Sequence, residues 1–187
     1  MKIDRIYTRG GDSGATSLGD GTRVAKHSLR VRAMGSVDEA NAAIGVALAR
    51  AGETAIAPVL VRIQNDLFDL GADLCVPESD DPKHSRLRIA AAQVAALERE
   101  IDRVNAGLNP LTSFVLPGGS IASAHLHLAR AITRRAECDV AALAGAESVN
   151  PELLKFLNRL SDLLFVLARQ ANDNGAADVL WQPGLNR

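Results

Sequence analysis

At 187 residues the chain is long enough for one domain with a sizeable core. Hydrophobic residues make up 47% of the chain and aromatic residues only 3%, so the core must be aliphatic, and Ala and Leu favour packed helices. Lys and Arg total 21 and Asp and Glu total 22, which gives a net charge of -1. Without a global positive field the chain is a poor match for nucleic acid or an anionic membrane, so any anionic ligand must be met by local charges.

The two cysteines, Cys75 and Cys138, are far apart and form no CxxC or CxxH pattern. This usage argues against a zinc site or a disulfide framework and favours a reducing, cytoplasmic location. Residues 1–5 carry no apolar region, so we expect no signal peptide. No run of about 18 apolar residues occurs, so we expect no membrane span.

Residues 1–35 are rich in Gly, Thr, Asp and Arg and show no sustained helical period, so we predict an ordered functional loop. Its residues 8–17 read TRGGDSGATS, and Lys26 follows. Glycines permit positive φ, so successive N–H groups can converge on phosphate oxygens, and Lys26 adds a charge. The loop does not match the Walker A pattern, and a purely structural glycine-rich turn is an equally good interpretation.

Five helical stretches are predicted after this loop. Ser36 and Glu39 match an S-x-x-E capping box, which predicts that the first helix begins at Ser36. The second spans about 54–74 and the third about 86–104, because apolar residues recur three or four positions apart in both.

The last two helices have clear start signals. Ser120 is a candidate N-cap for the fourth helix, which runs to about residue 143. Asn150 as N-cap and Pro151 as first helical residue begin the fifth, which we expect to stop near residues 174–175. Five helices with short links predict an all-α protein, an antiparallel five-helix bundle with an N-terminal Gly/Thr-rich loop.

The fourth helix carries a cluster of arginines. Arg130, Arg134 and Glu137 are spaced i, i+4 and i+7 and share one face, and Arg135 lies about 100° round from Arg134. Arginines in mid-helix are costly unless anions or carboxylates meet them. The cluster is therefore either an anion site or a solvated face in which Glu137 pairs with Arg134.

Two aromatic or polar features lie on other segments. Asn158, Asp162, Phe165 and Arg169 form a stripe on the fifth helix, where Asn158 is a candidate for a ligand amide or ribose contact and a plain polar flank is the alternative. Phe114 stands on a stiff apolar segment before a Gly-Gly helix start. It is either the wall of a pocket with free N–H groups behind it or a plug at the end of the bundle.

Two enzyme classes are excluded by spacing. A di-iron bundle needs inward-facing E-x-x-H pairs, whereas His125 and His127 are two residues apart, point to different faces and lack a Glu three residues before them. A Ser–His–Asp hydrolase of the α/β type needs a G-x-S-x-G elbow, which the sequence does not contain.

In their order and content these segments resemble the PduO-type ATP:cob(I)alamin adenosyltransferases, over nearly the whole chain. The family patterns have Thr or Lys where this chain has Gly10 and Ser13, and Arg where it has Cys138. The resemblance implies a bundle with ferritin-like up-down packing, assembled as a homotrimer with active sites between subunits. The most specific matches are residues 7–14, 35–41, 114–119, 134–137 and 158–162.

The resemblance also implies a role for each candidate residue. Asp38 and Arg130 are similar to a salt-bridged pair across the subunit interface, and Phe114 to the aromatic residue on the lower face of the corrin, so these three are the candidate catalytic residues. No protein residue is expected to ligate a metal. The implied ATP-binding residues are Thr8, Arg9, Gly10, Gly11, Thr16, Ser17, Lys26, Arg134, Arg135, Glu137 and Asn158.

The implied reaction is attack of cob(I)alamin, or a related corrinoid, on the 5′ carbon of ATP, which forms adenosylcobalamin and releases triphosphate. Arg and Lys side chains, loop N–H groups and Mg²⁺ would stabilise the leaving group. A flavin or other reductase would supply Co(I), and a B12-dependent enzyme would take the product. Two alternatives stay open: another ATP-binding transferase on a helical bundle, or a non-enzymatic scaffold bundle.

We expect a single domain over residues 1–187. It divides into a nucleotide-binding loop region at 1–35, a helical bundle at 36–175 and a C-terminal tail at 176–187. No nucleic-acid or membrane partner is expected.

Overall fold

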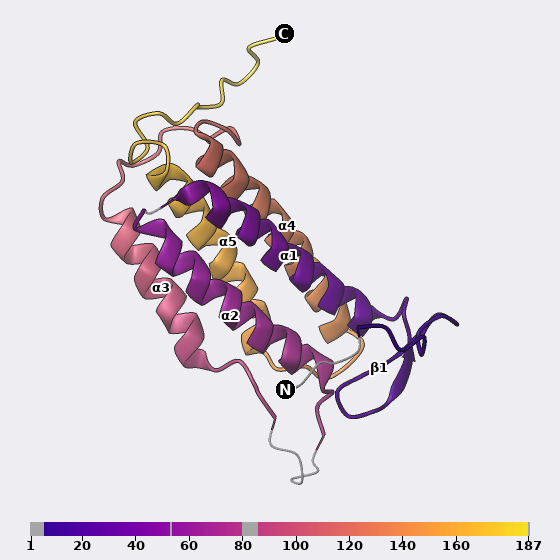
Figure 1. Ribbon diagram of the computed structural model, residues 1–187. Coiled ribbons are helices and arrows are strands. Elements are labelled where there is room, and N and C mark those ends of the chain that lie inside the picture. The colour runs from indigo at the N-terminus through magenta and orange to yellow at the C-terminus, as the bar shows by residue number, and fades with distance from the viewer. Residues whose placement is uncertain (1–5, 53, 80–85, 187) are drawn as a thin grey trace.

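The computed structural model describes residues 6–52, 54–79 and 86–186, and in these ranges the chain forms five helices and one short hairpin (Figure 1). The predicted all-α bundle is confirmed, and the hairpin is an addition that the sequence did not predict. The expectation about a signal peptide falls on residues 1–5, outside the described residues. Within the described ranges no helix is long and apolar enough to cross a membrane. The elements are β1 (Ala15–Ser17), β2 (Arg23–Ala25), α1 (Leu29–Ala51), α2 (Ile56–Cys75), α3 (Ala91–Asn105), α4 (Ile121–Ala144) and α5 (Glu152–Gln170).

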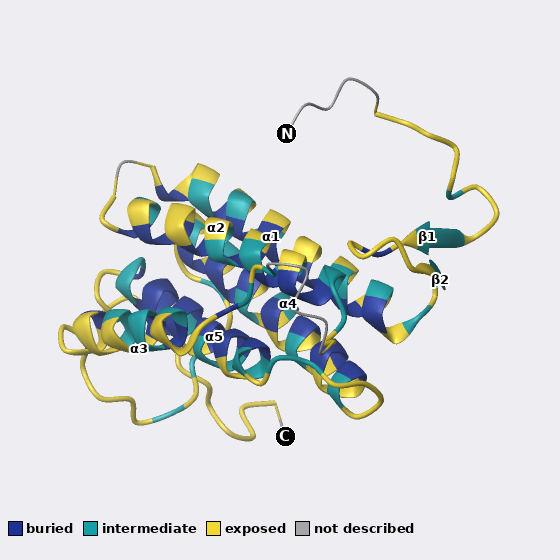
Figure 2. Cartoon of the chain, turned by 90° about the horizontal axis from the view of Figure 1, so that it is seen from below, coloured by how far each residue is buried: buried dark blue, intermediate teal, exposed yellow. Residues whose placement is uncertain are grey.

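Helix directions give the bundle two distinct ends. α1 runs antiparallel to α2 and α4, and α4 runs antiparallel to α5, whereas α3 and α5 run parallel (Figure 1). At the loop end, α1 begins and α2 and α4 finish; at the tail end, α4 begins and α5 finishes. The faces that the helices turn toward one another are buried and almost entirely aliphatic, as the composition predicts (Figure 2).

The first helix begins at Leu29, and the prediction of a start at Ser36 is wrong. The Ser28 hydroxyl accepts a hydrogen bond from the Val31 N–H at 3.4 Å and caps the true start. Ser36 and Glu39 lie inside the helix, where both side chains contact α4. The predicted boundary between a loop region and the bundle at 35/36 therefore cuts through α1.

A buried arginine explains why this start was missed. Arg30 is only 4% exposed, and its guanidinium donates to the Leu74 carbonyl at 2.7 Å and pairs with Glu147 at 2.7 Å. The capping-box pattern at Ser36 and Glu39 indicated a later start, and because arginine is ordinarily solvent-facing, Arg30 gave no sign of an inward helical face.

The third helix begins at Ala91 rather than near Arg86. The residues between them leave the helix because Arg88 donates to the Asp73 carbonyl at 2.7 Å and to the Asp73 carboxylate at 2.8 Å. Buried Asp73 thus holds this connection against the end of α2, which a local sequence pattern cannot indicate.

The other predicted boundaries agree with the structure to within about two residues, except for the end of α5. The Ser120 hydroxyl caps α4 by accepting from a backbone N–H at 3.1 Å. The Asn150 side-chain oxygen accepts from the Glu152 N–H at 3.0 Å, as an N-cap residue does, but α5 begins at Glu152 with Pro151 as its N-cap, one residue later than predicted. The helix itself ends at Gln170, and turns continue the chain past residues 174–175.

Candidate active site

The N-terminal loop, residues 6–28, is folded back on itself by the β1–β2 hairpin. Thr16 and Ser17 lie on β1, opposite Arg23 and its neighbours on β2. The Arg23 guanidinium donates to the Gly10 carbonyl at 2.8 Å and to the Ser17 hydroxyl at 3.2 Å. Arg23 thereby joins the glycine-rich segment to the hairpin; the sequence analysis missed it, because it lies outside the glycine-rich motif.

The same loop brings a second cation over its glycines. A methyl group added to Gly11 would lie 2.9 Å from the Lys26 Nζ, so the lysine side chain crosses directly over this glycine. The Lys26 N–H also donates to the Gly14 carbonyl at 2.9 Å. Thr8, Arg9 and Lys26 are exposed, and neither cation has an ion pair within the described residues. The Arg9 guanidinium lies over the Tyr7 ring, 5.6 Å from its centroid. The loop therefore offers two positive charges without an ion pair in the described ranges and several exposed residues.

The three arginines of α4 have three different surroundings. Arg135 forms an ion pair with Glu39 of α1. Arg134 is exposed and has no ion pair in the part of the chain that the structure describes. Arg130 is half-buried; burial first, and then the charge of Arg134, lower the pKa of Arg130. The positive charges of Arg130 and Arg134 therefore repel each other without a carboxylate paired to either in the described residues, which favours the anion-site interpretation.

Glu137 and Asn158 are brought together across α4 and α5. The Asn158 amide donates to the Glu137 carboxylate at 3.0 Å, and its oxygen accepts from Arg159. The solvated-face alternative required an ion pair between Glu137 and Arg134, and the described residues contain no such pair. Within the described ranges no group of three or more His, Cys, Asp or Glu side chains is placed to hold a metal ion.

A hollow of about 470 Å³ opens at the tail end of the bundle. Phe114 is 77% exposed and stands on its rim, so it neither plugs the bundle nor belongs to the core. Arg130 of α4 and Phe165 of α5 line the same hollow, which unites two residues that the sequence analysis had named on separate segments. The lining residues are Leu111, Thr112, Ser113, Phe114, Val115, Arg130 and Phe165.

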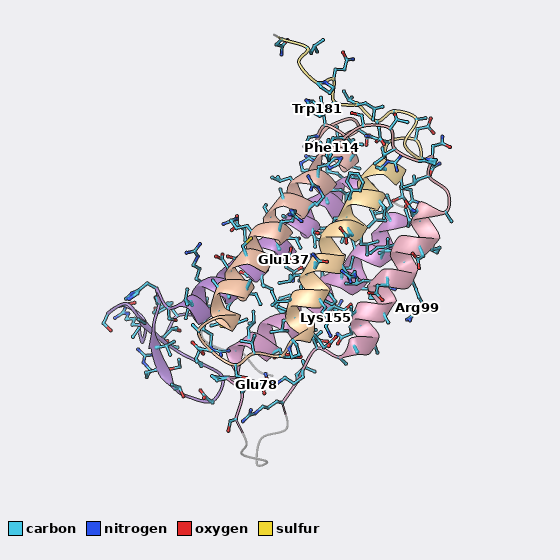
Figure 3. The ribbon with its side chains drawn as sticks, turned by 180° about the vertical axis from the view of Figure 1, so that it is seen from behind. Glu78, Arg99, Phe114, Glu137, Lys155 and Trp181 are labelled. Carbon is cyan, nitrogen blue, oxygen red and sulfur yellow. The ribbon has the colours of Figure 1, made fainter. Side chains whose placement is uncertain are left out.

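The C-terminal segment, residues 178–186, supports this rim, and the sequence analysis had treated it as a tail. The Trp181 N–H donates to the Phe114 carbonyl at 2.7 Å, and the two rings lie 5.9 Å apart at 58° (Figure 3). Asp178 anchors the segment through a buried ion pair with Arg169 at 2.8 Å. The sequence signal was present: the single tryptophan of the chain lies in this segment.

The loop and the hollow lie at opposite ends of the bundle. The loop is tied to the loop end, where the Gly19 N–H donates to the Cys75 carbonyl at 2.8 Å. Figure 3 shows Phe114 at the other end, with Glu137 between the two ends. From Arg130 to the end of α4 the helix rises about 20 Å at ~1.5 Å per residue. Asp38 is exposed on α1 and has no ion pair within the described residues, so one chain does not form the expected pair with Arg130.

Comparison with known proteins identifies the fold and the family. The family model described as "Cobalamin adenosyltransferase" matches residues 6–171. The chain belongs to the cobalamin adenosyltransferase family. The β1–β2 hairpin, the five helices and every residue that lines the hollow fall inside the matched range, whereas the C-terminal segment lies beyond it.

Relatives in this family cover essentially the whole chain. A corrinoid adenosyltransferase of Mycobacterium tuberculosis (strain ATCC 25618 / H37Rv) is 55% identical over 190 residues, which is 100% of this chain and 97% of that protein. A cobalamin adenosyltransferase of Cupriavidus metallidurans is 45% identical over 97% of this chain and 96% of its own length. A variant PduO-type ATP:corrinoid adenosyltransferase from Lactobacillus reuteri, solved with cobalamin and ATP, superimposes with a TM-score of 0.89 at 36% identity, covering 95% of this chain and 99% of that one.

Proposed function

We propose that this chain transfers the 5′-deoxyadenosyl group of ATP to the cobalt of cob(I)alamin or a related corrinoid. The Co(I) electron pair forms the new cobalt–carbon bond, and the bond from the 5′ carbon to oxygen breaks to release triphosphate. The observation that carries the proposal is the full-length similarity to a structure that holds both cobalamin and ATP. Because the nucleophile is the cobalt itself, the absence of a His–carboxylate pair from the predicted site residues agrees with this chemistry.

On the nucleotide side, the proposed contacts bind the triphosphate and the rest of the ATP molecule. Arg9 and Lys26 would meet the triphosphate with the backbone of Gly10 and Gly11, and Arg134 would add a planar bidentate donor. The Mg²⁺ of this proposal is the ion that accompanies the ATP substrate. The further proposed contacts are Thr8, Thr16, Ser17, Arg135, Glu137 and Asn158.

On the corrinoid side, the hollow supplies an apolar wall with one cation. Phe114 projects from the rim and would occupy the space below the corrin that a lower axial ligand takes. A cobalt without that ligand is easier to reduce from Co(II) to Co(I), and this reduction is the difficult step. A flavin or other reductase as electron donor, and a B12-dependent enzyme as acceptor, belong to this proposal, as does a cytoplasmic location.

A homotrimer with sites between subunits is the proposed assembly. Two observations support it: the loop and the hollow of one chain lie at opposite ends, and α4 turns an apolar stripe to the solvent. The outer α1–α4 face exposes three large apolar residues. Ile121 and Leu128 of α4 are 65% and 54% exposed, and Val46 of α1 is 48% exposed. Such a surface favours burial against another subunit, and contacts that close head to tail give rings. Asp38 would then pair with Arg130 of a neighbouring copy.

One experiment separates the candidate functions. The chain is mixed with Mg-ATP and chemically reduced cob(I)alamin, and adenosylcobalamin and triphosphate are quantified, with melting temperatures recorded for each ligand. An adenosyltransferase forms both products in equal amounts. Another ATP-binding transferase would melt higher with ATP but form no adenosylated corrinoid, and a scaffold would show no ATP-dependent shift. Light scattering at micromolar concentration tests the trimer, which a monomeric mass would contradict.

A further inference from the structure

His127 is a buried histidine that no part of the proposed reaction uses. It lies on α4, is 2% exposed, and both of its ring nitrogens lack a hydrogen-bond partner among the described residues. A neutral imidazole carries one N–H donor and one acceptor, and leaving both unmade in a buried place is costly. His125, two residues earlier, differs in that its ring is only partly buried and contacts the Ile121 carbonyl at 2.7 Å.

Two further polar groups without partners accompany it on the same face of α4. Ser123 lies four residues before His127 and Arg130 three residues after it, so the three side chains occupy successive turns. The Ser123 Oγ and the Arg130 Nε are also buried without a partner in the described ranges. A row of three unmatched polar groups calls for an explanation beyond packing, since isolated cases are already rare.

The row lies directly behind the hollow. The His127 ring meets the Phe165 ring edge-on, with centroids 6.1 Å apart and planes at 64°. Phe165 and Arg130 both line the hollow, whereas His127 does not. The charged groups that act on His127 are Arg130 of α4 and Asp178 of the C-terminal segment, and Asp178 is itself paired with a buried arginine of α5.

We propose that His127 is a positioning residue for the corrinoid side of the site. Its neutral ring accepts a hydrogen bond from a water that in turn accepts the Arg130 Nε–H, and the ring supports Phe165 from behind. It touches neither substrate and acts through the two hollow-lining side chains. The proposal rests on the proposed function, because it takes the hollow to be the corrinoid site. Ser123 completes the row as a partner for the imidazole N–H or for the same water.

Charge gives this role a pH dependence. Burial first, and then the charge of Arg130, lower the pKa of His127, while Asp178 opposes this effect. The ring is therefore neutral near pH 7 and can accept the hydrogen bond that links it through water to Arg130. Protonation at acid pH removes the acceptor and places a second positive charge beside Arg130, which would displace that side chain. An acid limb is expected in the pH profile of kcat/KM for the corrinoid, below the ordinary histidine pKa of about 6.5.

The test compares two variants with a matched control. His127→Leu removes both hydrogen-bonding atoms, His127→Gln keeps a donor and an acceptor but does not titrate, and His125→Gln makes the same change outside the row. For each we measure the Kd for Mg-ATP, kcat and KM for the corrinoid between pH 5 and 8 (about the range in which histidine titrates), and the melting temperature.

We expect His127→Leu to lower kcat/KM for the corrinoid by about tenfold, roughly the effect of one lost hydrogen bond to a charged group, with the Kd for Mg-ATP unchanged. His127→Gln should stay close to wild type at pH 7 and lose the acid limb, and His125→Gln should keep that limb. A wild-type corrinoid kcat/KM in His127→Leu would overturn the proposal.

If His127→Leu does not fold, the variant with Gln decides, because an acid limb that survives in His127→Gln excludes His127 as its source. Two further outcomes separate this inference from the proposed function. If the wild-type chain forms no adenosylated corrinoid at any pH, the proposed function itself fails. An active wild type with unaffected variants contradicts only the positioning role.

Discussion

Replacing Phe114 by alanine is expected to impair corrinoid handling while leaving the fold almost intact. The ring is 77% exposed, so about a quarter of its area is covered within one chain. A phenylalanine has about 200 Å² to bury, so the covered quarter amounts to about 50 Å², or about 1 kcal/mol. For a domain of this size that lowers the melting temperature by about 2–4 °C, whereas losing a core phenylalanine costs about 3–5 kcal/mol.

The exposed part of the ring sets the size of the functional effect. If a corrin covers the remaining ~150 Å², removing the ring forfeits about 3–4 kcal/mol of contact, or about 10²- to 10³-fold in kcat/KM for the corrinoid. The assay starts once from Co(II) with a fixed reductant and once from chemically prepared Co(I). Because the ring would keep a lower ligand off Co(II), the loss should be larger from Co(II), and the Kd for Mg-ATP should not change.

Phe68→Ala is the matched control for this prediction. Phe68 is 72% exposed on α2, so the same atoms are removed from a similarly exposed place outside the hollow. It should lose no more stability than Phe114→Ala and keep wild-type kinetics. The reasoning fails if Phe114→Ala lowers the melting temperature by 10 °C or so, as a core residue would, or if its losses from Co(II) and Co(I) are equal.

Four other outcomes are expected. Arg134→Ala should lower kcat/KM for ATP by about 10²- to 10³-fold, as for one preorganised donor, with an unchanged melting temperature because Arg134 is exposed and unpaired; normal ATP kinetics would remove it from the site. Gly11→Ala should weaken Mg-ATP binding, measured by calorimetry, since the added methyl displaces the Lys26 ammonium. Asp178→Asn breaks a buried ion pair and should cost about 3–5 kcal/mol in denaturant unfolding. Because the pKa of His127 is lowered, the unfolded chain binds more protons below about pH 6.5, so wild-type stability should fall on acidification more than that of His127→Gln.

Most of the fold was predictable because its signals are local. The apolar period of each helix and the start signals at Ser120 and Asn150 are readable from neighbouring residues. The structure has Ser120 as the N-cap of α4 and begins α5 one residue later than predicted. The start of α1 was not predictable in this way. Buried Arg30 is stable there only because Glu147 and the end of α2 meet its guanidinium, and those partners are distant in the sequence.

In the candidate site too, the residues with local sequence signals were predicted and those that depend on long-range contacts were not. Phe114 and Arg130 were found from motifs, and the structure brings both to one hollow. The support of that hollow was missed because it is long-range: residue 181 pairs with the backbone of residue 114 only after the chain has folded. His127 was tested only as a metal ligand, and no local pattern reveals that a buried histidine will lack partners.

The arginines of α4 show why a binding site can be retained at a cost to the free protein. Arg135 forms an ion pair with Glu39, but Arg134 has no ion pair within the described residues. Burial first, and then the charge of Arg134, lower the pKa of Arg130. If the cluster binds the triphosphate as we propose, the bound anion relieves this repulsion, and that relief contributes to the free energy of binding. Arg9 and Lys26 of the loop lie at the far end of the same bundle. In the proposed trimer a neighbouring copy would bring these two cations toward Arg134, and we then expect Mg-ATP to stabilise the trimer, which light scattering with and without the nucleotide would test.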